Sequence, residues 1–160
     1  MVLIIYVKYS MFNIREYILK EEMQMIKILM GEKGTGKTKR LIEMANNSVL
    51  NNTGHVVFID RGDRHIYNLS HEIRYVDTAQ FEIDDFCIFY GMICGIIAQN
   101  FDVSHIFIDS IFKIVDDSMD SLKKFLTKIE NLAQQFNIEF IITISGSVSS
   151  APEYVKQYIA

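Results

Sequence analysis

One segment of the chain has the residue types and the spacing of a phosphate-binding loop. Its sequence, GEKGTGKT from Gly31 to Thr38, fits the pattern G-x-x-x-x-G-K-[ST] at every fixed position. Glycines allow backbone N–H groups to turn toward phosphate oxygens where a Cβ would interfere. We expect Lys37 to reach the β- and γ-phosphates of a nucleotide, and the Thr38 hydroxyl to ligate Mg²⁺. The predicted binding residues are Gly31, Glu32, Lys33, Gly34, Thr35, Gly36, Lys37, Thr38 and Lys39.

Two aspartates are candidates for the second protein ligand of this Mg²⁺. Asp109 ends the apolar run 106–108, and Asp60 ends a similar run at 56–59. Where such a loop binds a nucleotide, a carboxylate at the end of another strand orients the ion. That strand normally lies well beyond the loop, with strand–helix units between them. The spacing therefore favours Asp109 over Asp60 as the Mg²⁺ ligand.

Strand-like and helix-like segments alternate along the chain and place these residues at strand ends. Near-continuous apolar strands separated by helices are typical of a parallel sheet covered on both faces. The predicted fold class is therefore α/β, a doubly wound, three-layer α/β/α sandwich with a mainly parallel sheet. The last helix is expected from a capping box that starts at Ser150. Strands are expected at 25–30, 55–60, 105–109 and 138–145, with a weaker one at 73–76, and helices at 37–46, 84–99, 118–136 and 152–159.

The order of these features resembles the RecA-like core of the P-loop NTPases over residues 25–145. Residues 106–110 look like the Walker B motif hhhDS of that family. The strand that ends at Ser145 is similar to the strand whose polar tip senses the γ-phosphate. The resemblance implies that ATP and Mg²⁺ are the ligands, with Asp109 at the ion and Ser145 or Thr143 near the γ-phosphate. Small proteins of this kind are also labelled as similar to pilus-retraction ATPases, but that family's acidic and histidine boxes are missing from the sequence.

The chain departs from the RecA-like family in the groups that would drive hydrolysis. The family carries a catalytic Glu about two residues after its second strand, whereas Gly62 holds that place here and Asp63 follows it. The candidates for the general base are therefore Asp63 and Asp60, and Lys37 completes the predicted catalytic set. The sequence has no arginine after position 74, so an arginine finger would come from a partner or from Arg40, Arg61, Arg64 or Arg74.

These features predict a P-loop NTPase that binds ATP·Mg²⁺. We expect a slow ATPase or a nucleotide-dependent switch that acts with a protein partner or as a homo-oligomer. The alternative is a P-loop kinase that transfers the γ-phosphate to a small molecule, although the back half has no arginine for the lid such kinases need. A net charge of −4 disfavours nucleic acid as a partner. No apolar run reaches the roughly 20 residues that span a membrane, and we expect a cytoplasmic protein.

The length of 160 residues fits one domain, expected over 25–160. Residues 1–24 are interpreted as an N-terminal extension, and our hypothesis is that the native start is Met25. The structural alternative is an added edge strand and helix. Cys87 and Cys94 lie in an apolar run and are predicted to be buried, reduced thiols. The four histidines, at 55, 65, 71 and 105, lack metal-ligand spacing, and structural roles are predicted for them.

Overall fold

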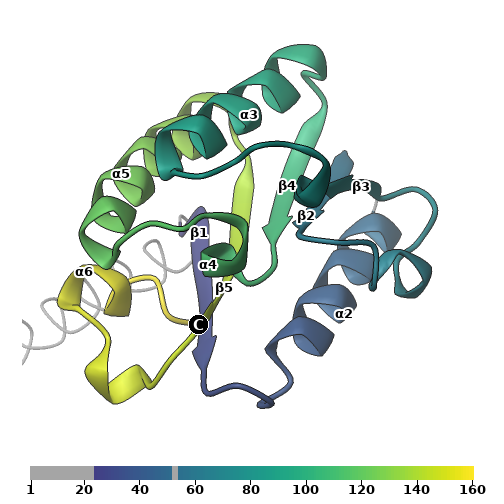
Figure 1. Ribbon diagram of the computed structural model, residues 1–160. Helices are drawn as coiled ribbons and strands as arrows, with labels where there is room; N and C mark the ends of the chain where they lie inside the picture. Colours follow the sequence, from purple (N-terminus) through teal and green to yellow (C-terminus); the bar gives the residue numbers. More distant parts are fainter. Residues whose placement is uncertain (1–23, 52–53) are drawn as a thin grey trace, which may run out of the picture.

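A computed structural model describes residues 24–51 and 54–160, and in this part of the chain five strands form one parallel sheet (Figure 1). The strand order is β1-β5-β4-β2-β3, and every pair of neighbours is parallel. The predicted α/β class and parallel sheet are confirmed. The strands are β1 (Ile26–Gly31), β2 (His55–Asp60), β3 (Arg74–Asp77), β4 (Val103–Ile108) and β5 (Glu139–Ser145).

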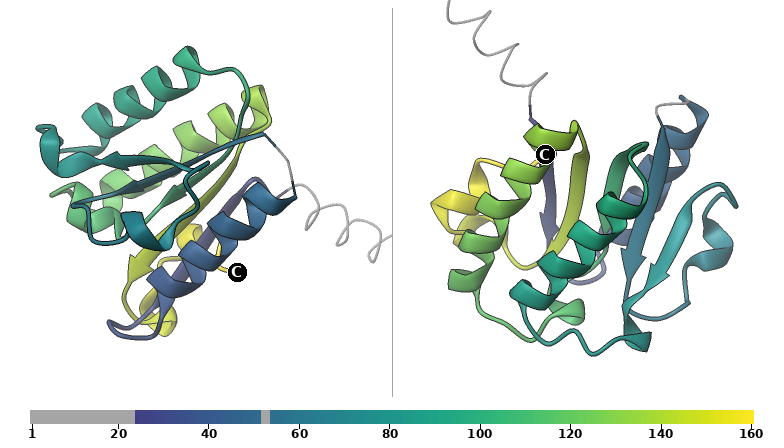
Figure 2. Two further views of the ribbon diagram at one scale, coloured as in Figure 1. Left: turned by 90° about the vertical axis from the view of Figure 1, so that its right-hand side faces the viewer. Right: turned by 90° about the horizontal axis from the view of Figure 1, so that it is seen from above.

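Helices cover both faces of the sheet, and this explains why the strands are apolar nearly throughout. Strand side chains alternate between the faces, so Ile106 and Ile108 pack with α3 and α5, while Phe107 packs with α2. The sheet lies between these two layers (Figure 2). The helices are α2 (Lys37–Leu50), α3 (Phe86–Gln99), α4 (Ile111–Ile114), α5 (Met119–Phe136) and α6 (Glu153–Lys156), with 3₁₀ turns η1 (Ile66–Asn68), η2 (Thr78–Gln80) and η3 (Val148–Ser150).

Side-chain caps begin the two long helices on one face, close to where the sequence predicts. The Asp85 carboxylate accepts a hydrogen bond from the Ile88 N–H at 2.8 Å and starts α3. The Ser118 hydroxyl accepts one from the Ser121 N–H at 3.2 Å and starts α5. Asn137 ends α5 in the left-handed conformation, with φ 55°. The predictions for 84–99 and 118–136 are therefore confirmed to within a few residues.

The predicted helix 152–159 is wrong in length and in its cap. Pro152 rather than Ser150 precedes α6, which covers one turn. The chain then runs beside β1, where the Ile28 N–H donates to the Tyr158 carbonyl at 2.7 Å and the Ala160 N–H donates to the Ile28 carbonyl at 3.1 Å. This pairing satisfies backbone groups at the outer edge of β1, so the segment is extended rather than helical.

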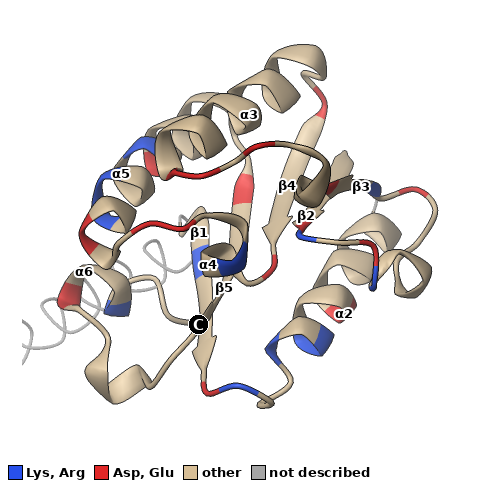
Figure 3. Cartoon of the chain, viewed as in Figure 1, with Lys and Arg blue, Asp and Glu red and all other residues tan. Residues whose placement is uncertain are grey.

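The prediction that both cysteines are buried is also wrong. Cys87 is exposed and Cys94 is partly exposed. The buried face of α3 consists of Phe86, Phe89 and neighbouring isoleucines. No charged residue occurs along α3 (Figure 3), so polarity does not mark its solvent-facing side in the sequence.

The structure bears only in part on two predictions, the N-terminal extension and the lack of a membrane-spanning segment. The hypothesis of an extension before Met25 lies, apart from Gln24, outside the described residues. Within residues 24–51 and 54–160, none of the helices combines the length and the apolar character needed to cross a membrane.

Candidate functional site

Residues 31–38 connect the end of β1 to the start of α2. Gly34 and Gly36 take left-handed conformations, with φ 86° and 83°, which favour glycine. The Thr35 hydroxyl donates to the Glu32 carbonyl at 2.8 Å and closes the turn. The N-cap residue of α2, Gly36, has no side chain that could cap the helix, and the first turn contains no acidic residue. The N–H groups of this turn and the positive end of the helix dipole are therefore available to an anion.

Lys37 folds back over this connection. Its ammonium donates to the carbonyls of Gly31 and Glu32 at 2.7 and 2.8 Å. The side chain is partly buried. A lysine in this position places a positive charge directly beside the uncapped helix N-terminus.

Thr38, in the first turn of α2, contacts the aspartate that follows β4. The Thr38 hydroxyl lies 3.0 Å from each carboxylate oxygen of Asp109, to which it donates. Asp109 is 2% exposed, and its Oδ1 also accepts a hydrogen bond from the Thr143 hydroxyl at 2.7 Å. The structure thus places Asp109 at Thr38, as the spacing argument requires. Its role as an Mg²⁺ ligand stays a prediction.

The two candidate hydroxyls on β5 have different environments. Thr143 is fully buried, and its oxygen also accepts a hydrogen bond from the Ser110 N–H at 2.6 Å. Ser145 is exposed at the end of the strand, opposite Gly31 in the sheet register. Of the two, Ser145 is therefore the hydroxyl that remains accessible beside the Gly31–Lys37 turn.

The two candidate bases also differ. Asp60 is 3% exposed at the end of β2, where its carboxylate accepts hydrogen bonds from the Arg61 N–H at 2.7 Å and the Tyr75 hydroxyl at 3.3 Å. Burial raises the pKa of the Asp60 carboxyl above its ordinary value, and the neighbouring Asp109 carboxylate acts in the same direction. Asp63 lies exposed in the turn that follows.

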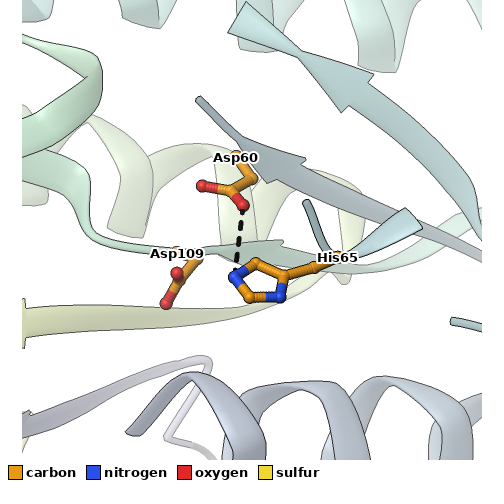
Figure 4. Close-up of side chains that lie close together, drawn as sticks. All are labelled: Asp60, His65 and Asp109. Atoms are coloured by element: carbon orange, nitrogen blue, oxygen red, sulfur yellow. Dashed lines mark ion pairs between the residues drawn. The ribbon is translucent and has the colours of Figure 1, made fainter. Parts of the chain in front are cut away.

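His65 belongs to this site, although sequence reasoning assigned it a structural role. Its Nε2 lies 4.0 Å from Asp60 Oδ2 (Figure 4). One ligand atom each from Asp60, His65 and Asp109 lie within 4.8 Å of one another. The only sequence signal is a histidine five residues after a strand-ending aspartate, and a spacing rule for helices or strands does not detect it.

Two residues of β3 anchor the turn 61–65, which places His65 near the ends of β2 and β4. The Tyr75 hydroxyl donates to the Gly62 carbonyl at 2.5 Å, and the Gly62 N–H donates to Asp77 Oδ1 at 2.7 Å. Asp77 also accepts from the Ala79 N–H, and these backbone hydrogen bonds lower the pKa of the Asp77 carboxyl. Two arginines proposed as finger residues are held elsewhere: Arg61 donates to the Lys113 carbonyl at 2.7 Å, and Arg74 to Gln99 Oε1 at 3.1 Å.

Comparison with known proteins gives no family assignment, because no protein-family model and no curated protein matches the chain. The interpretation therefore depends on the geometry. The connection after β1 leads to α2 on one face of the sheet, and the chain after β4 passes through the short α4 to α5 on the other (Figures 1 and 2). In open α/β sheets, ligands bind in the crevice that forms where connections diverge in this way, at the carboxyl ends of the strands.

Two glycine-to-alanine substitutions test whether Gly36 is needed for its backbone conformation or because a side chain would not fit there. An added Cβ at either Gly36 or the α3 residue Gly91 meets no atom of the described residues within 4 Å. We expect Gly36→Ala to lower the free energy of unfolding by about 1–2 kcal/mol, because its φ is left-handed. Gly91→Ala should raise the free energy of unfolding by about 0.5–1 kcal/mol, because alanine has less conformational freedom than glycine to lose when the helix forms. Urea unfolding without nucleotide measures both, and equal effects of one sign would contradict the prediction.

Proposed function

We propose that the protein is a P-loop NTPase with a RecA-like core, which binds ATP and Mg²⁺ through residues 31–39. It acts in the cytoplasm as a slow ATPase or a nucleotide-dependent switch, together with a protein partner or a second copy. The observation that carries the proposal is the contact between Thr38 and Asp109, which are 71 residues apart. The contact lies at the first turn of α2, whose N-cap residue, Gly36, has no side chain.

The residues present fit a nucleoside triphosphate. Gly34 and Gly36 have the positive φ that turns backbone N–H groups inward, and the first turn of α2 offers further donors. Lys37 would exchange its carbonyl partners for the β- and γ-phosphate oxygens, which carry more negative charge. Thr38 and Asp109 would hold Mg²⁺, which neutralises phosphate charge when it is bound.

The arrangement of the acidic groups supports slow hydrolysis rather than efficient turnover. Asp60 is buried and accepts a hydrogen bond on each carboxylate oxygen, so its side chain is held in place at the end of β2. Asp63, one position beyond the place that the resemblance assigns to the base, is exposed. A general base has to lie within hydrogen-bond reach of the water that it activates. Of the two, Asp63 is free to approach a γ-phosphate, provided that the turn 61–65 moves.

Asp109→Asn tests the proposed Mg²⁺ site, with Asp60→Asn as the matched control. We expect Asp109→Asn to keep measurable ATP binding but to lose the dependence of that binding on Mg²⁺. The enhancement of affinity by Mg²⁺ should fall by about 10–100-fold, because the carboxylate acts through the coordination shell of the ion. Calorimetric titration of ATP with Mg²⁺ and with EDTA measures the effect. If Asp60→Asn shows this loss and Asp109→Asn does not, the two aspartates have been assigned the wrong way round.

A further inference from the structure

Two buried carboxylates, Asp60 and Asp109, lie close together at the strand ends, and in the described part of the chain neither is paired with a lysine or an arginine. Asp60 is 3% exposed and Asp109 is 2% exposed. Over residues 24–51 and 54–160, no Lys or Arg nitrogen lies within 4.0 Å of either carboxylate, and the ion pair present is with His65. Buried charges are normally paired with opposite charges or coordinate metal ions. The site therefore has an excess of negative charge that a cation would balance.

The third group at this site is an imidazole rather than another carboxylate. His65 Nε2 and one oxygen from each aspartate lie within 4.8 Å of one another, and the three residues come from the ends of β2 and β4 and from the turn before η1 (Figure 4). The His65 side chain is 31% exposed, so the site opens to solvent on that side. Mixed nitrogen and oxygen donors favour divalent transition metals, whereas Mg²⁺ prefers oxygen alone.

Both carboxylates are already oriented by neighbouring groups. Asp60 accepts from the Arg61 N–H and the Tyr75 hydroxyl. Asp109 accepts from the hydroxyls of Thr38 and Thr143. Such outer hydrogen bonds fix the orientation of ligands in known metal sites. The two aspartates are therefore rigid components of the site, and His65, on a solvent-exposed turn, is the component that can adjust.

We propose that Asp60, His65 and Asp109 bind one divalent transition-metal ion, such as Zn²⁺, with the remaining coordination positions open to solvent. Ligand distances of about 2.0–2.2 Å around Zn²⁺ put ligand atoms roughly 3–3.5 Å apart. The spacing of up to 4.8 Å has to shorten by about 1–2 Å to reach this range, which requires the turn at His65 to move toward the two aspartates. The inference goes beyond the proposed function: Asp109 is a ligand in both, whereas Asp60, a candidate base there, is a metal ligand here, and His65 is new.

Calorimetric titration of the full chain with Zn²⁺, after EDTA treatment and without nucleotide, tests the proposal. We expect one Zn²⁺ per chain in the wild type. His65→Gln should weaken binding by at least about tenfold, and Asp60→Asn should do the same, because each removes a ligand. His71→Gln is the matched control, since this exposed histidine in the same region lies outside the cluster, and its affinity should equal that of the wild type. Excess Mg²⁺ should not displace the Zn²⁺.

His65 is partly exposed, so His65→Gln is expected to fold, and equal melting temperatures with EDTA check this. Unchanged Zn²⁺ affinity in folded His65→Gln overturns the proposal, as does equal weakening in His71→Gln. Lys37→Ala separates the two proposals, because it should lose ATP binding and keep Zn²⁺ binding. A wild type that binds ATP·Mg²⁺ but no Zn²⁺ refutes the transition-metal site alone, and one that binds Zn²⁺ but no ATP refutes the nucleotide site alone.

Discussion

Lys37→Ala should abolish the thermal stabilisation by ATP·Mg²⁺ while leaving the melting temperature without nucleotide nearly unchanged. At 100 times the dissociation constant, a ligand stabilises the folded state by about 2.7 kcal/mol. For a chain of this length, that corresponds to a rise in melting temperature of roughly 5–10 °C. Among residues 24–51 and 54–160, the Lys37 ammonium hydrogen-bonds to two carbonyls of its own connection, Gly31 and Glu32. Its removal should therefore affect the phosphates far more than the core.

Lys124→Ala is the matched control for this experiment. Lys124 is an exposed lysine on α5, so its removal changes the net charge equally and leaves the β1–α2 connection intact. This variant should show the same shift with ATP as the wild type. If Lys37→Ala also keeps the full shift, nucleotide does not bind at residues 31–38 and the proposed function fails.

Hydrolysis by the dilute, isolated protein should be far slower than the roughly 1–10³ s⁻¹ typical of enzymes. An arginine finger contributes about 10³–10⁵ in rate where it operates, and Arg61 and Arg74 are bonded away from residues 31–38. A poorly placed base costs about 10²–10⁴ more. If a second copy supplies an arginine, the rate per chain should rise steeply with protein concentration.

Phosphate release measured against protein concentration checks this prediction. Lys37→Ala, purified in the same way, serves as the blank for contaminating ATPases. Brisk hydrolysis that does not change with concentration would mean that one chain contains the whole catalytic set. Gly62 and Asp63 would then have been interpreted wrongly as a defect.

The strands could be predicted because the relevant information is local, and the contact between Thr38 and Asp109 follows from where the strands end. An apolar run marks a strand buried on both faces, and parallel strands bring their carboxyl ends to one edge of the sheet. The amphipathic pattern of α5 is equally clear, because its buried positions are all apolar and none of its charged residues is buried. In each case a short stretch of sequence determines which groups are buried.

His65 could not be predicted because its position depends on contacts distant in sequence. The turn that carries it is held by Tyr75 and Asp77 of β3, a strand with only a weak sequence signal. The exposure of Cys87 was missed for a related reason: which side of uncharged α3 faces solvent is decided by packing against α5. The short α6 follows from pairing of the chain with β1, more than 100 residues earlier.

The pairing of β1 with β5 also constrains how the protein folds. Ile26 lies opposite Phe140, so the strand that ends in the glycine-rich connection finds its sheet neighbour only after most of the chain has been synthesised. Closing such long loops slows folding. The earlier strands β2, β3 and β4 have mutual partners and can associate before β5 emerges. During synthesis, the connection proposed to bind nucleotide should therefore be among the last parts to be fixed in place, and a nascent chain that stalls before residue 140 would leave β1 without its partner β5.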